Sequence, residues 1–274
     1  MKKSITPHGM YVILFVSSQL LLGCREKEEA KPGPTPVAEV KLGKAVHSGG
    51  ASREFSYHSD GQLLEIHGKG MYALGDNAES RSGVLYNAFG KIKEITTTGD
   101  SFSYKTLYSY NASRQLVRTE EYINARLQYY FTYEYNAQGQ LIAKYSFAPQ
   151  TPESSNFSAA IKREYEYDPR NNLSRVTEFS KAAASNDWTI YLSYQYLEYD
   201  NGHSVNHWLS YPHYLPDVKL QHNNPGKEIR TNHPSGATTV TTHAYAYNSK
   251  NYPVKRLTSS SNNTSSQITF SYTD

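Results

Sequence analysis

The sequence predicts an all-β protein, built from antiparallel β-hairpin repeats that form one strongly curled sheet, either a half-pipe or a nearly closed barrel. Three observations lead to this prediction. A short pattern recurs from Phe55 to the C-terminus, its turn residues fall at fixed offsets, and its flanking residues alternate as in β-strands. The clearest copy spans residues 133–141 and reads Tyr-Glu-Tyr-Asn-Ala-Gln-Gly-Gln-Leu.

Each copy has an aromatic anchor just before its turn. The anchors are Tyr57, Tyr86, Tyr110, Tyr135, Tyr167, Tyr199 and Tyr247, with gaps of 29, 24, 25, 32, 32 and 48 residues. The last gap is twice 24, which predicts a degenerate copy midway, and residues 222–226 (His-Asn-Asn-Pro-Gly) lie there. The spacing therefore predicts eight hairpins.

The turn residues follow a common pattern. In seven of the eight copies the residue after the anchor is Asn or Asp, whose side chains start turns by accepting hydrogen bonds from nearby backbone N–H groups. The fourth residue after the anchor is Gly or Asn in most copies, and these residues tolerate positive φ; Arg114 and His203 depart from this pattern. After the turn, buried-type residues such as Leu63 and Ile66 are three apart, which predicts a bulge.

Eight hairpins imply about 16 strands, with residues 268–272 as a closing strand. Open twisted sheets rarely exceed about 10 strands without curling, so we expect a wound sheet. No segment shows a helical apolar period; residues 158–160 and 181–184 could hold one helical turn at most. The same alternation also occurs in membrane-spanning β-barrels, although charges on both strands of the repeats argue against one.

The pattern resembles the YD-repeat (RHS-like) family, whose core reads Tyr-x-Tyr-Asp, two free residues, Gly, any residue, Leu. The resemblance covers about residues 53–274. Residues 165–168 (Tyr-Glu-Tyr-Asp) keep the Tyr-Asp pair, whereas most copies carry Asn. This departure places the chain nearest to short, degenerate relatives, and the motif implies a β-hairpin without implying a function.

The N-terminus has the features of an export signal. Lys2 and Lys3 form a basic start, and residues 11–22 form an apolar stretch too short to span a bilayer. The stretch ends in Leu-Leu-Gly-Cys at residues 21–24, which resembles a bacterial lipoprotein lipobox. The resemblance implies cleavage before Cys24 and its triacylation, with palmitate among the acyl chains. A chance cysteine after the leader is the alternative.

Three segments are expected: a signal peptide at 1–23, a lipidated cysteine with a flexible tether at 24–50, and the repeat domain at 51–274. Arg25 follows the cysteine, which by the lipoprotein sorting rule implies the outer membrane. Residues 27–29 (Lys-Glu-Glu) resemble a surface-export signal, although they also fit an ordinary solvated tether. We therefore expect a membrane-anchored protein of the outer membrane, displayed on the cell surface.

Composition limits the possible partners. Removing Lys2 and Lys3 leaves 26 basic against 25 acidic residues, a net charge of +1, which argues against nucleic-acid binding. Apolar content is low at 38%, and 25 tyrosines compensate, because each can bury its ring and keep its hydroxyl hydrogen-bonded.

The sequence contains no recognised catalytic motif, phosphate-binding loop or cofactor motif. His203 and His207 are four residues apart, but this spacing does not converge on a β-hairpin, and we expect no metal site. The expected role is non-enzymatic: a scaffold or binding module for a glycan or an envelope protein partner. The alternative is a secreted glycan hydrolase whose carboxylate pair is not recognisable from the sequence.

Insertions lengthen the repeats at residues 148–160, 181–188 and 207–216. Aromatic side chains on such loops can stack on sugars or on a protein partner. The candidate ligand-binding residues are Trp188, Trp208, Tyr211 and Tyr214. The alternative for the third insertion is that Trp208 and Tyr211 cap an open end of the curled sheet.

Overall fold

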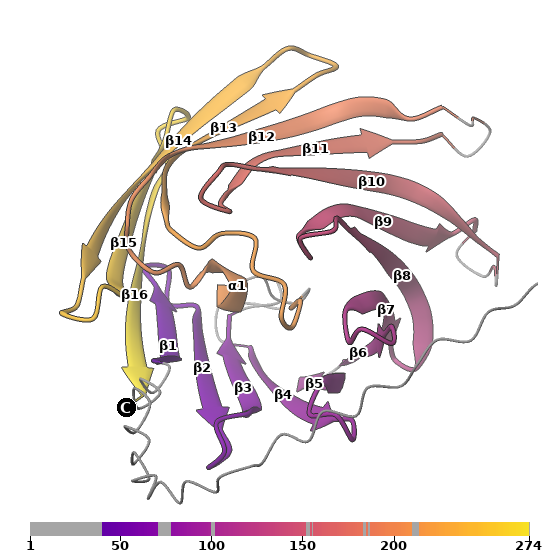
Figure 1. Ribbon diagram of the computed structural model, residues 1–274, viewed down its shortest axis with the longest axis horizontal. Coiled ribbons are helices and arrows are strands. Elements are labelled where there is room, and N and C mark those ends of the chain that lie inside the picture. The colour runs from indigo at the N-terminus through magenta and orange to yellow at the C-terminus, as the bar shows by residue number, and fades with distance from the viewer. Residues whose placement is uncertain are drawn as a thin grey trace, which may run out of the picture. The chain divides into compact units, whose positions relative to one another are not determined.

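The computed structural model describes residues 40–70, 78–99, 102–151, 154, 156–182, 185, 187–209 and 214–273. These residues form a closed antiparallel barrel of 16 strands, in which every strand pairs with its neighbours in the sequence and β1 pairs with β16 (Figure 1). The strands are β1 (Lys41–His47), β2 (Ser52–Tyr57), β3 (Leu63–Lys69), β4 (Glu79–Tyr86), β5 (Ile92–Gly99), β6 (Ser103–Tyr110), β7 (Leu116–Ile123), β8 (Arg126–Tyr135), β9 (Leu141–Pro149), β10 (Phe157–Tyr167), β11 (Leu173–Ser180), β12 (Thr189–Tyr199), β13 (Pro225–Asn232), β14 (Thr238–Tyr247), β15 (Pro253–Ser260) and β16 (Ser265–Thr273).

The fold class expected from the sequence is confirmed, and the sheet closes fully. One short helix, α1 (Asn206–Leu209), lies inside the barrel (Figure 1). Residues 158–160, a possible helical turn, belong instead to β10. No helix in the described part of the chain is long and apolar enough to cross a membrane.

The barrel begins earlier than expected. Residues 41–47 form β1, which pairs with both β2 and β16, and Gly50 has a φ of 90° in the turn between β1 and β2. The barrel therefore includes residues 41–47, which were expected to belong to the tether. Sequence reasoning missed β1 because it has no Tyr-Asx anchor of its own and pairs with the barrel's last strand, β16. The leader and Cys24 lie outside the described residues.

The repeated turn has the hydrogen bonds that the sequence predicts. In the copy at Asn87, the side-chain Oδ1 accepts hydrogen bonds from the backbone N of Phe89 and of Lys91, at 2.9 and 3.0 Å. The fourth residue after the anchor has positive φ in six copies, at Gly61, Gly90, Arg114, Gly139, Asn171 and Asn251. Arg114 thus takes the same backbone conformation as the glycines, although its side chain is less suited to it.

The bulge expected after each turn is also present. The register shifts by one residue at the anchor, so that Tyr57 pairs with Leu63 whereas Ser56 pairs with Glu65. The extra residue, Leu64, is exposed, and Leu63 and Ile66 both point into the core. The shift recurs at Tyr86, Tyr110, Tyr135, Tyr167 and Tyr247.

The anchor tyrosines link successive hairpins through a set of hydrogen bonds that we call the tyrosine ladder. Five anchor hydroxyls, and that of Tyr272 in β16, donate to a carbonyl oxygen at or next to the start of the preceding strand; Tyr135 and Tyr247 do not make this bond. The six bonds, 2.5 to 2.8 Å long, run from Tyr57 to Leu42, Tyr86 to Leu63, Tyr110 to Ile92, Tyr167 to Leu141, Tyr199 to Leu173 and Tyr272 to Pro253. Burial raises the pKa of Tyr86 to about 12, so its hydroxyl remains a donor at neutral pH.

One expected hairpin is absent. Residues 222–226 do not form a turn; Asn224 instead completes the turn that Asp200 begins. The backbone N of Asp200 donates to Asn224 O at 3.1 Å, and Asp200 Oδ1 accepts from the backbone N of Gly202 and of Asn224, at 2.9 and 3.1 Å. The two copies inferred around residues 199 and 222 are therefore halves of a single turn, split by an insertion.

The insertion spans residues 203–223, and we call its described residues, 203–209 and 214–223, the plug. The plug lies inside the barrel. Trp208 lies edge-on to Phe55, with ring centroids 5.7 Å apart, and stacks on Tyr214 at 5.6 Å. Tyr108 donates its hydroxyl to Tyr214 O at 3.0 Å, and Arg53 Nη1 donates to Leu209 O at 2.6 Å. The described part of the plug thus packs against β2 and β6 and adds Val205 and Tyr214 to the barrel's core.

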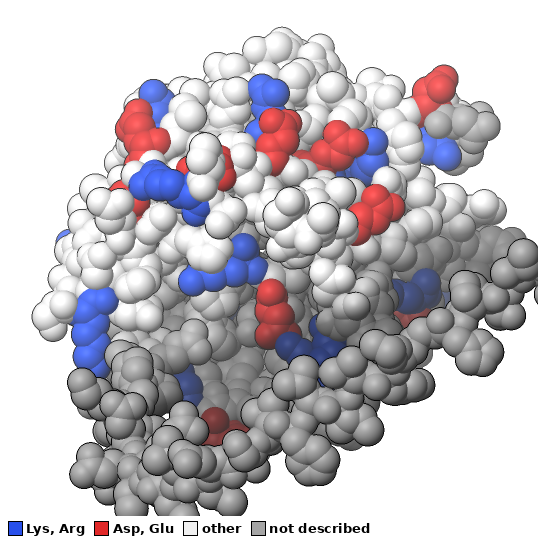
Figure 2. All heavy atoms as spheres, viewed as in Figure 1, with Lys and Arg blue, Asp and Glu red and all other residues white. Residues whose placement is uncertain are grey.

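The outer wall carries both paired charges and exposed apolar side chains. Ion pairs join neighbouring strands there, including Lys44 with Glu54 at 3.2 Å and Arg81 with Glu65 at 2.9 Å. Large apolar side chains are exposed between them, such as Leu85, Ile142 and Leu257. The face of the molecule shown in Figure 2 also has positive and negative side chains interspersed.

The tyrosine ladder can be tested with a matched pair of substitutions. Tyr110 donates to Ile92 O at 2.7 Å, whereas the buried hydroxyl of Tyr135 has no partner among the described residues. Tyr110→Phe should lower the free energy of unfolding by about 1 kcal/mol because it removes a made hydrogen bond. Tyr135→Phe should change it by less than about 0.5 kcal/mol. Urea denaturation measures both, and equal losses would contradict the ladder's role.

Candidate functional site

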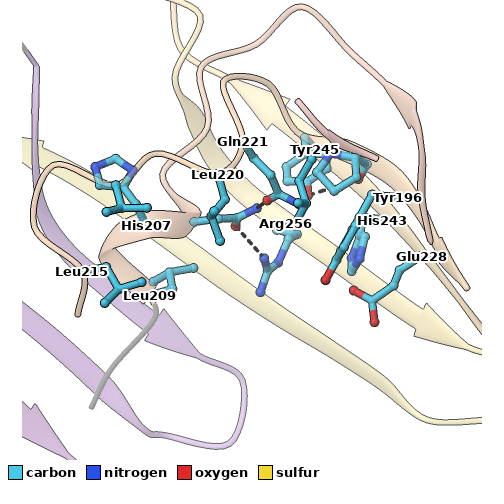
Figure 3. Close-up of a pocket in the computed structure, with 14 residues that line it drawn as sticks. Tyr196, His207, Leu209, Leu215, Leu220, Gln221, Glu228, His243, Tyr245 and Arg256 are labelled. Atoms are coloured by element: carbon cyan, nitrogen blue, oxygen red, sulfur yellow. Dashed lines mark hydrogen bonds between the residues drawn. The ribbon is translucent and has the colours of Figure 1, made fainter. Parts of the chain in front are cut away.

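A cavity of about 360 Å³ lies inside the barrel, between the plug and strands β12 to β15 (Figure 3). One side is apolar and comes mainly from the plug, with Leu209, Leu215 and Leu220. The other side is polar and comes from the strands: Tyr196 on β12, Glu228 on β13, His243 and Tyr245 on β14, and Arg256 on β15. The cavity is therefore amphipathic.

Strand register brings these polar residues together. Tyr196 pairs with Glu228 across β12 and β13, and Tyr245 pairs with Arg256 across β14 and β15. Residues two apart on a strand share a face, so His243 points inward beside Tyr245. Four consecutive strands thus present hydrogen-bonding side chains to one space.

Arg256 connects the wall to the plug. Its Nη1 donates to Asn206 Oδ1 at 3.1 Å, and Asn206 Nδ2 donates to Gln221 Oε1 at 2.6 Å (Figure 3). The buried Nε of Arg256 has no hydrogen-bond partner among the described residues. A buried donor without a partner is costly, and a ligand or an ordered water would satisfy it.

The titratable groups of the cavity are shifted toward their neutral forms. Burial raises the pKa of Glu228, and the nearby Arg256 and Arg230 partly offset this shift. Burial, with a further contribution from Arg256, lowers the pKa of His243 to about 4. His243 is therefore neutral at pH 7 and can donate and accept hydrogen bonds; its Nδ1 lies 3.0 Å from Thr258 Oγ1.

A second group of charged side chains lies on the neighbouring part of the wall, on β9 to β12. Glu178 accepts from Arg163 Nε and from the Tyr191 hydroxyl, both at 2.6 Å. Lys144 lies over the Phe131 ring at 4.0 Å, and burial, together with nearby Arg163, lowers its pKa to about 8. Both Glu178 oxygens are thus engaged in structural contacts. Among the described residues, no three His, Cys, Asp or Glu side chains are grouped as metal ligands.

The structure separates the aromatic residues singled out from the sequence. Trp208 and Tyr214 meet in the plug, where their rings stack and Trp208 lies edge-on to Phe55. That Trp208 and Tyr211 cap an open end of the sheet stays a prediction. Trp188 lies far from them along the wall, edge-on to Tyr145 with centroids 6.3 Å apart. Tyr211 and Cys24 lie outside the described residues.

Sequence reasoning missed the cavity's polar wall. Counting back by two from the anchor Tyr247 would have placed Tyr245 and His243 on the inward face. Glu228 could not be placed in this way because residues 222–226 were taken for a turn. Arg256 follows its turn by way of a bulge, which changes the parity of the strand.

Comparison with known proteins identifies the fold and no family. No protein-family model matches the chain, and no curated protein matches it. A porin-like protein from Bacteroides uniformis has a similar structure, with a TM-score of 0.56 and 11% identity over 85% of this chain and 96% of that one. At this identity the likeness concerns the fold alone.

Two weaker likenesses support no conclusion. A porin-like protein from Bacteroides vulgatus matches with a TM-score of 0.44 and 13% identity, over 86% of this chain and 99% of that one. A TcdB2-TccC3 structure matches with a TM-score of 0.23 and 14% identity, over 78% of this chain and 12% of that one. The YD-repeat resemblance thus rests on the sequence pattern alone.

The plug should respond to acid through His207. Burial, with nearby Lys219, lowers the pKa of His207 to about 4, and its buried Nδ1 has no partner among the described residues. Between the ordinary pKa of about 6.5 and pH 4 the unfolded chain binds more protons. The stability that neutral His207 contributes is therefore complete above pH 6.5 and declines as the pH falls toward 4.

Urea denaturation at pH 7.5 and pH 5 tests this expectation. The His207→Leu variant should lose less stability between the two pH values than the wild type does. Leu209→Ala is the control: it weakens the plug without removing a titrating group, so it should lower stability similarly at both pH values. An unchanged pH dependence in His207→Leu would rule out a contribution from this histidine.

Proposed function

We propose that this protein is a non-enzymatic binding module of the bacterial outer membrane, anchored through lipid on Cys24 and displayed on the cell surface. Its YD-like hairpins would form the scaffold, and the cavity beside the plug would bind one saccharide unit of a glycan. The cavity, with polar strand residues facing an apolar plug surface, is the observation that carries this proposal.

The size and lining of the cavity support a small ligand. Its volume of about 360 Å³ lies within the usual range for small-molecule sites, about 300–1,000 Å³, and is too small for a folded partner. Sugars present hydroxyl groups around an apolar ring face. Tyr196 and Tyr245 offer aromatic surface, while Gln221, Glu228 and Arg256 offer donors and acceptors at its edge.

The glycan hydrolase alternative has less support. An inverting or retaining mechanism requires two facing carboxyl groups. Glu228 is the only acidic residue among those that line the cavity, and Glu178 on the neighbouring strand β11 is held by Arg163 and Tyr191. The arrangement is therefore better suited to holding a sugar than to cleaving it.

An envelope protein partner is a second candidate, favoured by Trp188. Its ring lies 6.3 Å from that of Tyr145, and the ammonium groups of Lys162 and Lys181 each lie 5.8 Å from it. This cluster is separate from the cavity, so the two roles can be tested with different variants.

Glycan arrays followed by calorimetry test the sugar site. Tyr196→Leu should weaken binding about tenfold or more because it removes both an aromatic face and a hydroxyl from the cavity. Trp188→Leu is the matched control and should bind as the wild type does. If Trp188→Leu alone lost binding, the sugar site would lie at the cluster around Trp188 and not in the cavity. Absence of binding to any glycan would refute the proposal.

Anchoring is tested separately. Cys24→Ala should abolish incorporation of labelled palmitate and release the protein from the membrane fraction, because several acyl chains supply the anchor. Ser4→Ala, also in the leader, should leave both unchanged. Protease added to intact cells then tests surface display. A Cys24→Ala protein that stays in the membrane fraction would contradict lipid anchoring.

A further inference from the structure

The charges around the cavity are not balanced. Arg230 and Arg256 carry two positive charges on the inward face of β13 and β15, whereas Glu228 is the only carboxylate among the cavity's lining residues; Arg53 lies on the inward face of β2. Neither Arg230, Arg256 nor Glu228 forms an ion pair within the described parts of the chain. This region of the lumen therefore has unneutralised positive charge.

The pKa values of two nearby histidines are lowered by burial and by these arginines. Burial lowers the pKa of His47, and the positive charges of Arg53 and Arg256 lower it further. His243, on the other side of Arg256, shows the same two causes. Because the pKa values of His47 and His243 are lowered, neither histidine adds charge at neutral pH. Glu228 supplies one negative charge, so the arginines are the dominant charges near the plug.

Arg256 is the best placed of the three for contact with a ligand. Arg53 is buried and committed to the carbonyl oxygens of Trp208 and Leu209. Arg230 is exposed and does not line the cavity. Arg256 lines it, with one hydrogen bond to Asn206 and an unpartnered Nε (Figure 3).

From this arrangement we infer that the cavity selects an anionic saccharide, whose carboxylate or sulfate group Arg256 holds. The inference rests on the proposed sugar-binding function and narrows its ligand class. A guanidinium group binds both anions by paired N–H donors, so the two are treated as one chemistry. The apolar plug surface and Tyr245 would contact the sugar ring, and Arg230 would attract the anion at longer range.

Calorimetric titration of the full mature protein tests the inference with three related ligands: glucose, glucuronate and glucose 6-sulfate. Both anions should bind about ten- to a hundredfold more tightly than glucose, with the advantage shrinking as salt is raised. Arg256→Gln should reduce the anions to the affinity of glucose. Arg175→Gln is the matched control, because Arg175 is exposed on the outer face of β11.

Arg256 also donates a hydrogen bond to Asn206, so Arg256→Gln could lose anion binding by disturbing the plug. A second variant separates the loss of charge from such a structural effect. Arg230→Gln removes a charge without removing a described contact, and it should lower anion affinity severalfold while leaving glucose binding unchanged. If only one of the two anions binds more tightly than glucose, that result shows whether Arg256 holds a carboxylate or a sulfate group. Equal affinity of wild-type protein for glucose and both anions would overturn the inference and leave the sugar site intact. Absence of binding by all three would overturn the sugar site as well.

Discussion

The hydrogen bond that five of the anchor tyrosines donate to the preceding strand is the interaction on which this barrel depends. A single two-stranded hairpin is at most marginally stable in water, so each one needs its neighbours. The hydroxyl reaches a carbonyl at the start of the returning strand, which fixes the register between hairpins as well as within them. The ladder reaches the strands on either side of the seam: Tyr57 on β2 donates to Leu42 on β1, and Tyr272 on β16 donates to Pro253 on β15. The backbone pairing of β1 with β16 then closes the sheet.

The plug follows from the width of that barrel. Wall side chains can fill an eight-stranded barrel, but 16 strands leave a space that they cannot fill. Here the space is filled by an insertion within one turn, whose ends are held by Asp200 and Asn224. Lengthening a loop costs little entropy once its ends are fixed. The turn thus keeps the geometry of the other copies while it supplies both the core and one wall of the cavity.

Features set by local sequence could be predicted, and features set by distant contacts could not. The Asx side chain, the positive φ four residues after the anchor and the bulge all lie within nine residues, and all were found where expected. The missing turn at residues 222–226 was a wrong inference because its Asn pairs with Asp200, 24 residues earlier. Likewise β1 is a strand because of its pairing with β16, at the other end of the chain. The cavity was missed for the same reason: its two walls meet only when the plug enters a closed barrel.

The placement of charge distinguishes the two surfaces of the sheet. On the outer wall, oppositely charged residues pair across strands and are exposed, so each pair contributes little and costs little. Inside, Glu178 is neutralised by Arg163, but Arg256 and Glu228 border the cavity without an ion pair. Partly buried charges that lack partners destabilise a fold, and the apolar plug beside them adds to that cost. Arg256 offsets part of this cost through its hydrogen bond to Asn206 on the plug, but its buried Nε is left as a donor that a ligand would satisfy.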